Sequence, residues 1–173
     1  MIAALLLAAM APAATPPVAG SPPPAASTSA NHATHYYPPA ADATALVEAA
    51  LAEAAGGGRR AVLVFGADWC HDSQALAAVL SSETFSAEFG DRYRVVFIDV
   101  DHPKADHGRN QELIARFGVK KMMGTPEMLV IGADGKPLNS IKDAQSWHNA
   151  GNRSVNAILG WFGALPPAPK PAR

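Results

Sequence analysis

The chain has 173 residues, of which 49% are hydrophobic and 17% are charged. This length is enough for one ordinary domain with a sizeable core, and we do not expect a second full domain. The 14 Lys and Arg residues nearly balance the 15 Asp and Glu residues. Such a balance provides no basic field to attract nucleic acid or anionic lipid, so neither is expected as a partner.

The first 14 residues, MIAALLLAAMAPAA, predict a secretory signal peptide. Their apolar stretch is too short to span a bilayer as a helix but matches the core of a signal peptide. Ala11-Pro12-Ala13 supplies small residues in the A-x-A cleavage pattern, although no Lys or Arg precedes the core. A retained anchor and a misplaced start are the alternatives. We expect an exported protein of a bacterial periplasm, without membrane contact beyond this signal.

Two segments are poor in apolar periodicity and rich in Pro and Ala. Residues 15–41 predict a disordered linker, and residues 165–173 predict a disordered tail, because neither composition buries enough surface to offset the ordering of the chain. The folded domain is therefore predicted over residues 42–164.

The first half of this domain predicts two buried strands and two helices. Asp42 can cap a first helix that ends at Gly56-Gly57-Gly58. The apolar run AVLVFGA at residues 61–67 and YRVVFIDV at residues 93–100 each predict a strand. A helix after Cys70 separates these strands, which predicts a right-handed parallel crossover.

The second half predicts a short helix at residues 109–118, a hairpin and terminal helices. EMLVIGADGKPLNSI at residues 127–141 predicts two strands around an Asp134-Gly135 turn. Residues 143–165 predict one helix or a pair, with Val155, Ile158, Leu159 and Phe162 on its inner face. The element order predicts an α/β fold in which helices cover both faces of a mixed central β-sheet.

Three local signals resemble the thioredoxin superfamily over about residues 43–163. A strand ends in Ala67-Asp68-Trp69-Cys70 at a helix start, Gly124-Thr125-Pro126 directly precedes a strand, and a hairpin follows. The resemblance implies a thioredoxin-like fold with a C-x-x-S variant of the active site. It also implies that Pro126 is cis and lies against Cys70, which leaves the backbone of Thr125 free to pair with an extended substrate.

Cys70 is the only cysteine of the sequence, so no intramolecular disulfide is available to it. At a helix start, free backbone N–H groups and the helix dipole would favour its thiolate. We predict catalytic roles for Cys70, for Ser73, whose hydroxyl could donate to the sulfur, and for His71 as a proton donor or positive charge. Asp72 would oppose the thiolate. Trp69, Asp72, Thr125 and Pro126 are the predicted substrate-binding residues.

Ser73 stands where a dithiol oxidoreductase has the cysteine that releases its substrate. An adduct on Cys70 would have to be resolved by an outside thiol such as glutathione, or by a second thiol of the partner. Val64 also stands where thioredoxins often bury an acid, and His71-Asp72 replaces the usual Gly-Pro. We therefore predict a monothiol protein that exchanges thiols and disulfides with exported proteins or glutathione. Because Cys70 has no partner cysteine within the chain, two chains could also form a disulfide-linked dimer through Cys70.

Other interpretations remain open. Cys70 could be a sulfenic acid sensor or a buried small hydrophobe, and the chain could be a redox-inactive binding module for a client or a metal. Two sets of side chains carry the metal alternative: Cys70, His71, Met122 and Met123, or Asp101, His102, Asp106 and His107. Neither set has a recognised ligand spacing, so no metal site and no cofactor are predicted.

Overall fold

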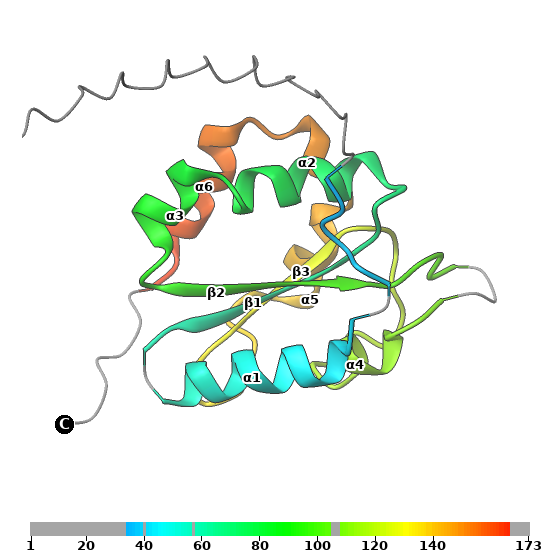
Figure 1. Ribbon diagram of the computed structural model, residues 1–173, viewed down its shortest axis with the longest axis horizontal. Helices are drawn as coiled ribbons and strands as arrows, with labels where there is room; N and C mark the ends of the chain where they lie inside the picture. The colour runs from blue at the N-terminus through cyan, green and yellow to red at the C-terminus, as the bar shows by residue number, and fades with distance from the viewer. Residues whose placement is uncertain (1–33, 40, 57, 105–107, 167–173) are drawn as a thin grey trace, which may run out of the picture. The chain divides into compact units, whose positions relative to one another are not determined.

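Three strands form the central sheet of the computed structural model, which describes residues 34–39, 41–56, 58–104 and 108–166 (Figure 1). The predicted signal peptide, residues 15–33 of the predicted linker and residues 167–173 of the predicted tail lie outside the described residues. The elements in chain order are α1 (Ala43–Ala55), β1 (Arg60–Gly66), α2 (His71–Leu80), α3 (Glu83–Phe89), β2 (Tyr93–Asp99), α4 (Gln111–Ala115), β3 (Glu127–Ile131), α5 (Ile141–Gln145), the 3-10 helix η1 (Ser146–Asn152) and α6 (Val155–Ala164).

β1 lies in the middle of the sheet, in the order β2-β1-β3. β2 pairs with it in parallel and β3 in antiparallel register, so that Leu63 lies between Val96 and Leu129. All seven residues of β1 are buried, as its continuous apolar run predicts for a strand covered on both faces. The mixed sheet and the parallel pairing of β1 with β2 confirm the predicted topology.

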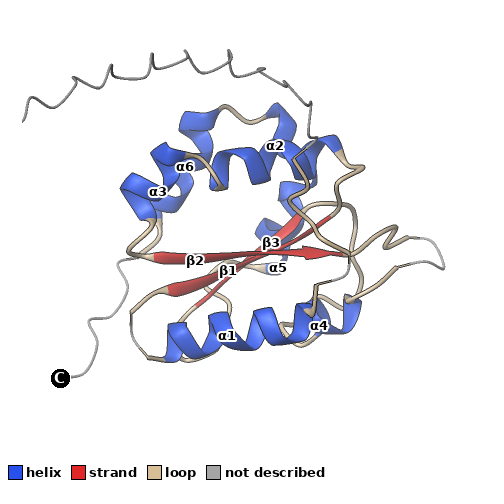
Figure 2. Cartoon of the chain, in the orientation of Figure 1, coloured by secondary structure: helices blue, strands red, loops and turns tan. Residues whose placement is uncertain are grey.

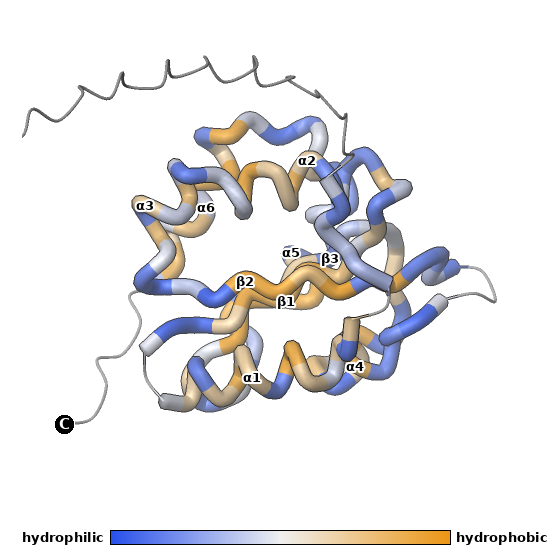
Figure 3. Tube along the Cα trace, viewed as in Figure 1, coloured by the Kyte–Doolittle hydropathy of each residue, from blue (hydrophilic) through white to orange (hydrophobic). Residues whose placement is uncertain are grey.

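Helices cover both faces of this sheet (Figure 2). α1 and α4 lie on one face, and α2, α3 and α6 lie on the other. Because successive side chains of a strand point to opposite faces, Leu63 and Phe65 pack in the cluster with α1, whereas Val62 and Val64 pack in the cluster with α2. The strands between the two layers are the most continuous hydrophobic segments of the trace (Figure 3). The predicted α/β fold is confirmed.

Local sequence signals set most of the helix starts. The carboxylate of Asp42 accepts a hydrogen bond from the N–H of Ala45 over 3.0 Å, which caps α1 as predicted. Ser82 caps α3 and Ser154 caps α6 in the same way. Val155, predicted on the inner face, is the first residue of α6 and is exposed. None of the helices in the described part of the chain is long and apolar enough to cross a membrane.

The second strand of the predicted hairpin does not form. Gly135 adopts the left-handed φ of +74° that the turn requires, but beyond it only a single bridge joins Ile131 to Pro137. Around that bridge Leu138 N donates to Val130 O over 2.8 Å and Gly132 N donates to Lys136 O over 2.9 Å. Beyond Leu138, the side chain of Asn139 pairs with β3 in place of a strand backbone. Its amide oxygen accepts from Val130 N and its amide nitrogen donates to Met128 O, both over 2.9 Å.

The packed part of the chain begins before the predicted boundary at residue 42, because Tyr37 is part of the core and the partly buried Tyr36 packs against it. Tyr37 is 1% exposed, and its ring meets that of Phe97 edge-on with centroids 5.4 Å apart. At the other end, Leu165 packs on the α2 side and the carbonyl of Pro166 accepts from the Arg60 guanidinium. These apolar and hydrogen-bonded contacts hold residues 36–37 and 165–166, although their composition predicted a linker and a tail.

Candidate functional site

Cys70 lies at the junction of β1 and α2, where it is the N-cap residue of the helix with φ −92° and ψ 118°. Its thiol donates a hydrogen bond to the carbonyl oxygen of Thr125 over 3.2 Å. The peptide bond between Thr125 and Pro126 is cis. The structure therefore brings together the cysteine and the bend before β3, which are 55 positions apart in the sequence. Cys70 as a whole residue is 8% exposed, so it counts among the buried residues.

Ser73 is fully buried in the first turn of α2. Its hydroxyl oxygen accepts a hydrogen bond from the N–H of Ala67 over 3.3 Å, and its carbonyl accepts from the phenol of Tyr37 over 3.2 Å. The hydroxyl thus lies against the backbone at the end of β1, whereas the sequence suggested a hydrogen bond to the sulfur. In this arrangement Ser73 fixes the start of α2 to the strand before it.

His71 and Asp72 both face η1. The carboxylate of Asp72 accepts a hydrogen bond from the N–H of Gly151 over 2.8 Å. A Cβ at Gly151 would lie 2.9 Å from the Nδ1 atom of His71 and 3.1 Å from the Asp72 carboxylate, so this close approach requires glycine. Asp72 therefore joins α2 to η1, and a contact of either side chain with a substrate stays a prediction.

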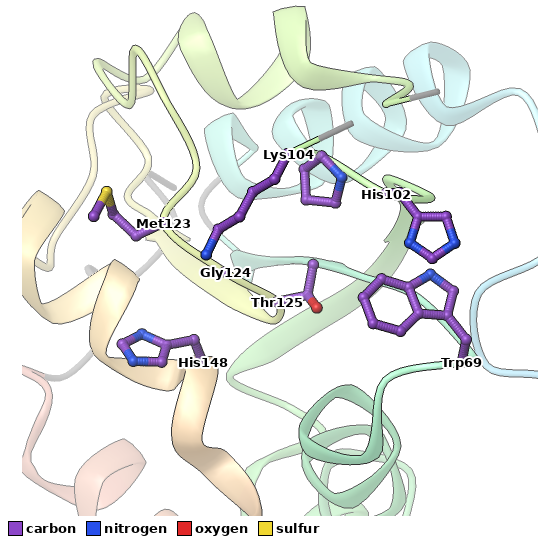
Figure 4. A pocket seen from close by; sticks show the side chains of 8 residues that line it. Trp69, His102, Lys104, Met123, Gly124, Thr125 and His148 are labelled. Carbon is purple, nitrogen blue, oxygen red and sulfur yellow. The ribbon is translucent and has the colours of Figure 1, made fainter. Parts of the chain in front are cut away.

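Trp69 is 56% exposed beside Cys70, so it is a surface side chain and not part of the core. Its ring stacks on His102 with centroids 4.4 Å apart, and its indole N–H donates to the carbonyl of Asp101 over 3.1 Å. Trp69 and His102 lie at one end of a pocket of about 400 Å³, Met123 and His148 lie at the other end, and Thr125 lies between them (Figure 4). The other lining residues are Pro103, Lys104 and Gly124. The pocket adjoins the thiol and has both aromatic and cationic walls.

The sequence analysis missed Glu127, the first residue of β3. Its side chain is fully buried, and one carboxylate oxygen accepts a hydrogen bond from the N–H of Met123 over 2.5 Å. Burial raises the pKa of this carboxyl, and the N–H groups of Met123 and Gly124 oppose that rise, as do the nearby His148 and Lys104. A lone acid at the start of the apolar run EMLVI is the sequence signal that could have found it.

Asp68 was also missed as the anchor of the N-terminal segment. Its carboxylate accepts hydrogen bonds from the N–H groups of Tyr36 and Tyr37 over 2.9 and 3.2 Å, and it lies 3.2 Å from the His35 ring. Burial raises the pKa of the Tyr37 phenol well above its ordinary value, and the electrostatic interaction with Cys70 is the second cause. The N-terminal segment therefore contacts Asp68 and Ser73, which lie on either side of Cys70 in the sequence.

Only part of the two metal-ligand sets considered from the sequence lies in the described residues. No group of three His, Cys, Asp or Glu side chains there is arranged to hold a metal ion. Met122 is buried in the core cluster with α1. Asp106 and His107 lie outside the described residues.

A sequence model described as thioredoxin-like matches residues 42–133. Among solved structures, the chain is similar to a disulphide isomerase from Xylella fastidiosa Temecula1, with 32% identity and a TM-score of 0.65, covering 75% of this chain and 95% of that one. An exposed lipoprotein thioredoxin of Streptococcus pneumoniae matches with 21% identity and a TM-score of 0.42, over 66% of this chain and 90% of that one. A search of curated proteins gives no significant match.

This chain belongs to the thioredoxin-like family. The family match, the fold and the lone cysteine at the helix start together support a role in thiol–disulfide chemistry.

Proposed function

We propose that the protein is a monothiol member of its family, which exchanges disulfides through Cys70 and relies on an outside thiol to complete each cycle. The observation that carries this proposal is the position of the Cys70 thiol, 3.2 Å from the carbonyl of Thr125 at the start of α2. Attack on a disulfide requires the thiolate form of this group.

The first step is attack by the Cys70 thiolate on one sulfur of a substrate disulfide. A bond forms between Cys70 Sγ and that sulfur, the substrate S–S bond breaks, and the second substrate sulfur leaves as a thiolate that takes up a proton from solvent. The substrate bond is reduced and Cys70 is oxidised to a mixed disulfide. No other molecule is required for this step.

The second step needs a thiol from elsewhere, because Cys70 is the only cysteine in the sequence. Ser73 occupies the place one helical turn away, and a hydroxyl does not form a disulfide. A glutathione thiolate, or a second thiol of the bound protein, attacks the mixed disulfide and releases Cys70 as a thiolate. When the partner's own thiol attacks, the net result is isomerisation of its disulfides.

We propose exported proteins as the substrates and the bacterial periplasm as the compartment. The apolar first 14 residues support this placement, because they match a signal peptide in length and carry an A-x-A pattern. Proteins in oxidising compartments carry the disulfides on which such chemistry acts. The similarity to a disulphide isomerase agrees with the same substrate class.

The test is to follow the intact mass of the reduced protein with glutathione disulfide and with a disulfide-linked peptide. We expect one adduct per chain, its loss on addition of free glutathione, and no adduct on Cys70→Ala. Wild-type protein blocked at its thiol by alkylation is the matched control, because it keeps the fold. The proposal would be refuted if the wild-type mass stayed unmodified after prolonged incubation. It would also be refuted if disulfide exchange persisted in Cys70→Ala. Formation of a disulfide-linked dimer alone would also count against turnover.

A binding module without turnover is the second candidate, favoured by the low exposure of Cys70 beside the pocket of about 400 Å³. In that function the pocket holds a client segment, and the thiol next to it takes no part in any reaction. Cys70→Ala would then retain client affinity, whereas mixed-disulfide capture would be lost in the same variant. Measuring client affinity and mixed-disulfide formation on the same protein sample distinguishes the two functions.

A further inference from the structure

Glu127 is a carboxylic acid in the interior of the fold. It begins β3, pairs in register with Phe65 of β1 and is 0% exposed. The four residues that follow it in β3 are all apolar and buried. Burying a carboxyl group is costly unless hydrogen bonds compensate, so packing alone does not account for an acid at this position.

The hydrogen bonds of Glu127 go to the segment that forms the bend next to Cys70. One carboxylate oxygen accepts from the N–H of Met123 over 2.5 Å, and the N–H of Gly124 also bonds to the carboxylate. These contacts close a loop of backbone over Thr125 and Pro126. The carbonyl of Thr125, inside this loop, is the acceptor for the Cys70 thiol. A continuous set of contacts thus runs from Glu127 to the sulfur.

The second carboxylate oxygen of Glu127 is buried without a hydrogen-bond partner among the described residues. A buried polar atom without a partner costs stability, so the carboxyl is only half compensated where it stands. Lys104 and His148 are the charged groups that act on it from outside β3, and both line the pocket beside Cys70. The residue therefore lies between the reactive bend and the pocket wall.

We propose that Glu127 is a positioning residue of the Cys70 site. It fixes the backbone from Met123 to Thr125 so that the Thr125 carbonyl meets the thiol and the Gly124-Thr125 edge of the pocket is presented to an extended substrate. Glu127 does not itself touch the sulfur. The part of the proposal that concerns substrate rests on the proposed function, whereas the fixing of the backbone does not.

The test compares Glu127→Leu, which removes the acceptor, with Glu127→Gln, which keeps an acceptor oxygen. Val130→Ala is the matched control, because it weakens the same strand without touching the bend. We expect Glu127→Leu to raise the KM for a peptide disulfide about five- to tenfold, as loss of one hydrogen-bonded backbone contact would. The rate with a small disulfide that cannot pair with backbone should stay within about twofold. Glu127→Gln should restore the peptide KM, and Val130→Ala should leave it unchanged.

A second measurement keeps the proposal testable if Glu127→Leu does not fold or if the wild type exchanges no disulfide. In the reduced wild-type protein, the NMR shift of the Met123 amide should follow the titration of the Glu127 carboxyl, and in Glu127→Gln this pH dependence should vanish. The inference would be overturned if the chemical shift of the Met123 amide did not change as the Glu127 carboxyl titrates. Equal KM values for the peptide disulfide in Glu127→Leu and Val130→Ala would also overturn it. Absence of any wild-type exchange would instead refute the proposed function alone.

Discussion

The phenol of Tyr37 donates a hydrogen bond to the carbonyl oxygen of Ser73 across 36 positions of sequence. This bond ties the N-terminal segment to the first turn of α2, directly after Cys70. The Tyr37 ring also explains why β1 ends in glycine, because a Cβ at Gly66 would lie 2.7 Å from that ring. The segment before α1 is thus a structural part of the site.

Tyr37→Phe should lower the free energy of unfolding by about 1 kcal/mol, the usual net contribution of one hydrogen bond. Tyr37→Ala should lower it by about 3–5 kcal/mol, because it also leaves a cavity against Phe97. Urea unfolding followed by fluorescence measures both changes, and Tyr36→Phe at the partly buried neighbouring position is the control. A Tyr37→Ala variant as stable as the wild type would contradict the placement of Tyr37 in the core.

The elements that the sequence predicted well are those defined by local signals. β1 follows from an unbroken apolar run, and α1 follows from its Asp42 cap and a face of small apolar residues that includes Val47 and Ala50. The approach of Cys70 to Thr125 was also predictable, but only from the resemblance of two motifs to one family. Nothing in the spacing of these residues predicts it.

The features that the sequence did not predict depend on contacts between distant positions. Tyr37 lies in a segment without periodicity, so composition indicated a linker, and its buried contacts with Ser73 and Phe97 become visible only in three dimensions. The second hairpin strand failed because the side chain of Asn139 competes successfully for the backbone of β3. An alternating sequence pattern does not show that a polar side chain such as that of Asn139 will take the hydrogen bonds of the neighbouring strand.

Ser73→Cys should convert the site into a dithiol. The hydroxyl of Ser73 lies in the first turn of α2, buried beside Ala67, and a thiol there is one helical turn from Cys70. We expect an intramolecular disulfide under oxidising conditions and release of mixed disulfides without added glutathione. Intact mass and thiol titration before and after oxidation measure this change, with Ser81→Cys at the other end of α2 as the control. Two free thiols in oxidised Ser73→Cys would show that residue 73 is held too far from the sulfur.

Asp72→Ala should weaken the attachment of η1 to α2. The variant loses the acceptor for the Gly151 N–H at a partly exposed position, so the free energy of unfolding should fall by about 0.5–1 kcal/mol. Asp72→Asn keeps an acceptor oxygen and should recover most of the loss. Thermal or urea unfolding measures the stability, and disulfide exchange is followed on the same samples. A change in the peptide KM with unchanged stability would instead support the substrate contact predicted from the sequence.

Glu127 should make stability depend on pH. Its carboxyl has an ordinary pKa of 4.5, and in the folded protein burial raises that pKa, since the ionised form is disfavoured away from water. Below about pH 4.5 the carboxyl is protonated in both states, so its contribution to stability is fully present. As the pH rises from there through the raised pKa, the unfolded chain releases the proton first and the free energy of unfolding falls.

Glu127→Gln removes this titration, so the stability of the wild type relative to Glu127→Gln should decline as the pH rises above about 4.5 and level off above the raised pKa. Urea unfolding of both proteins between about pH 4 and about pH 8 measures the difference. Burial also raises the pKa of Asp99, but that carboxyl is present in both proteins and its effect cancels in the comparison. Parallel stability curves would mean that the Glu127 carboxyl ionises as readily in the folded protein as in the unfolded chain. The inference that hydrogen bonds compensate only half of the buried Glu127 carboxyl would then be wrong.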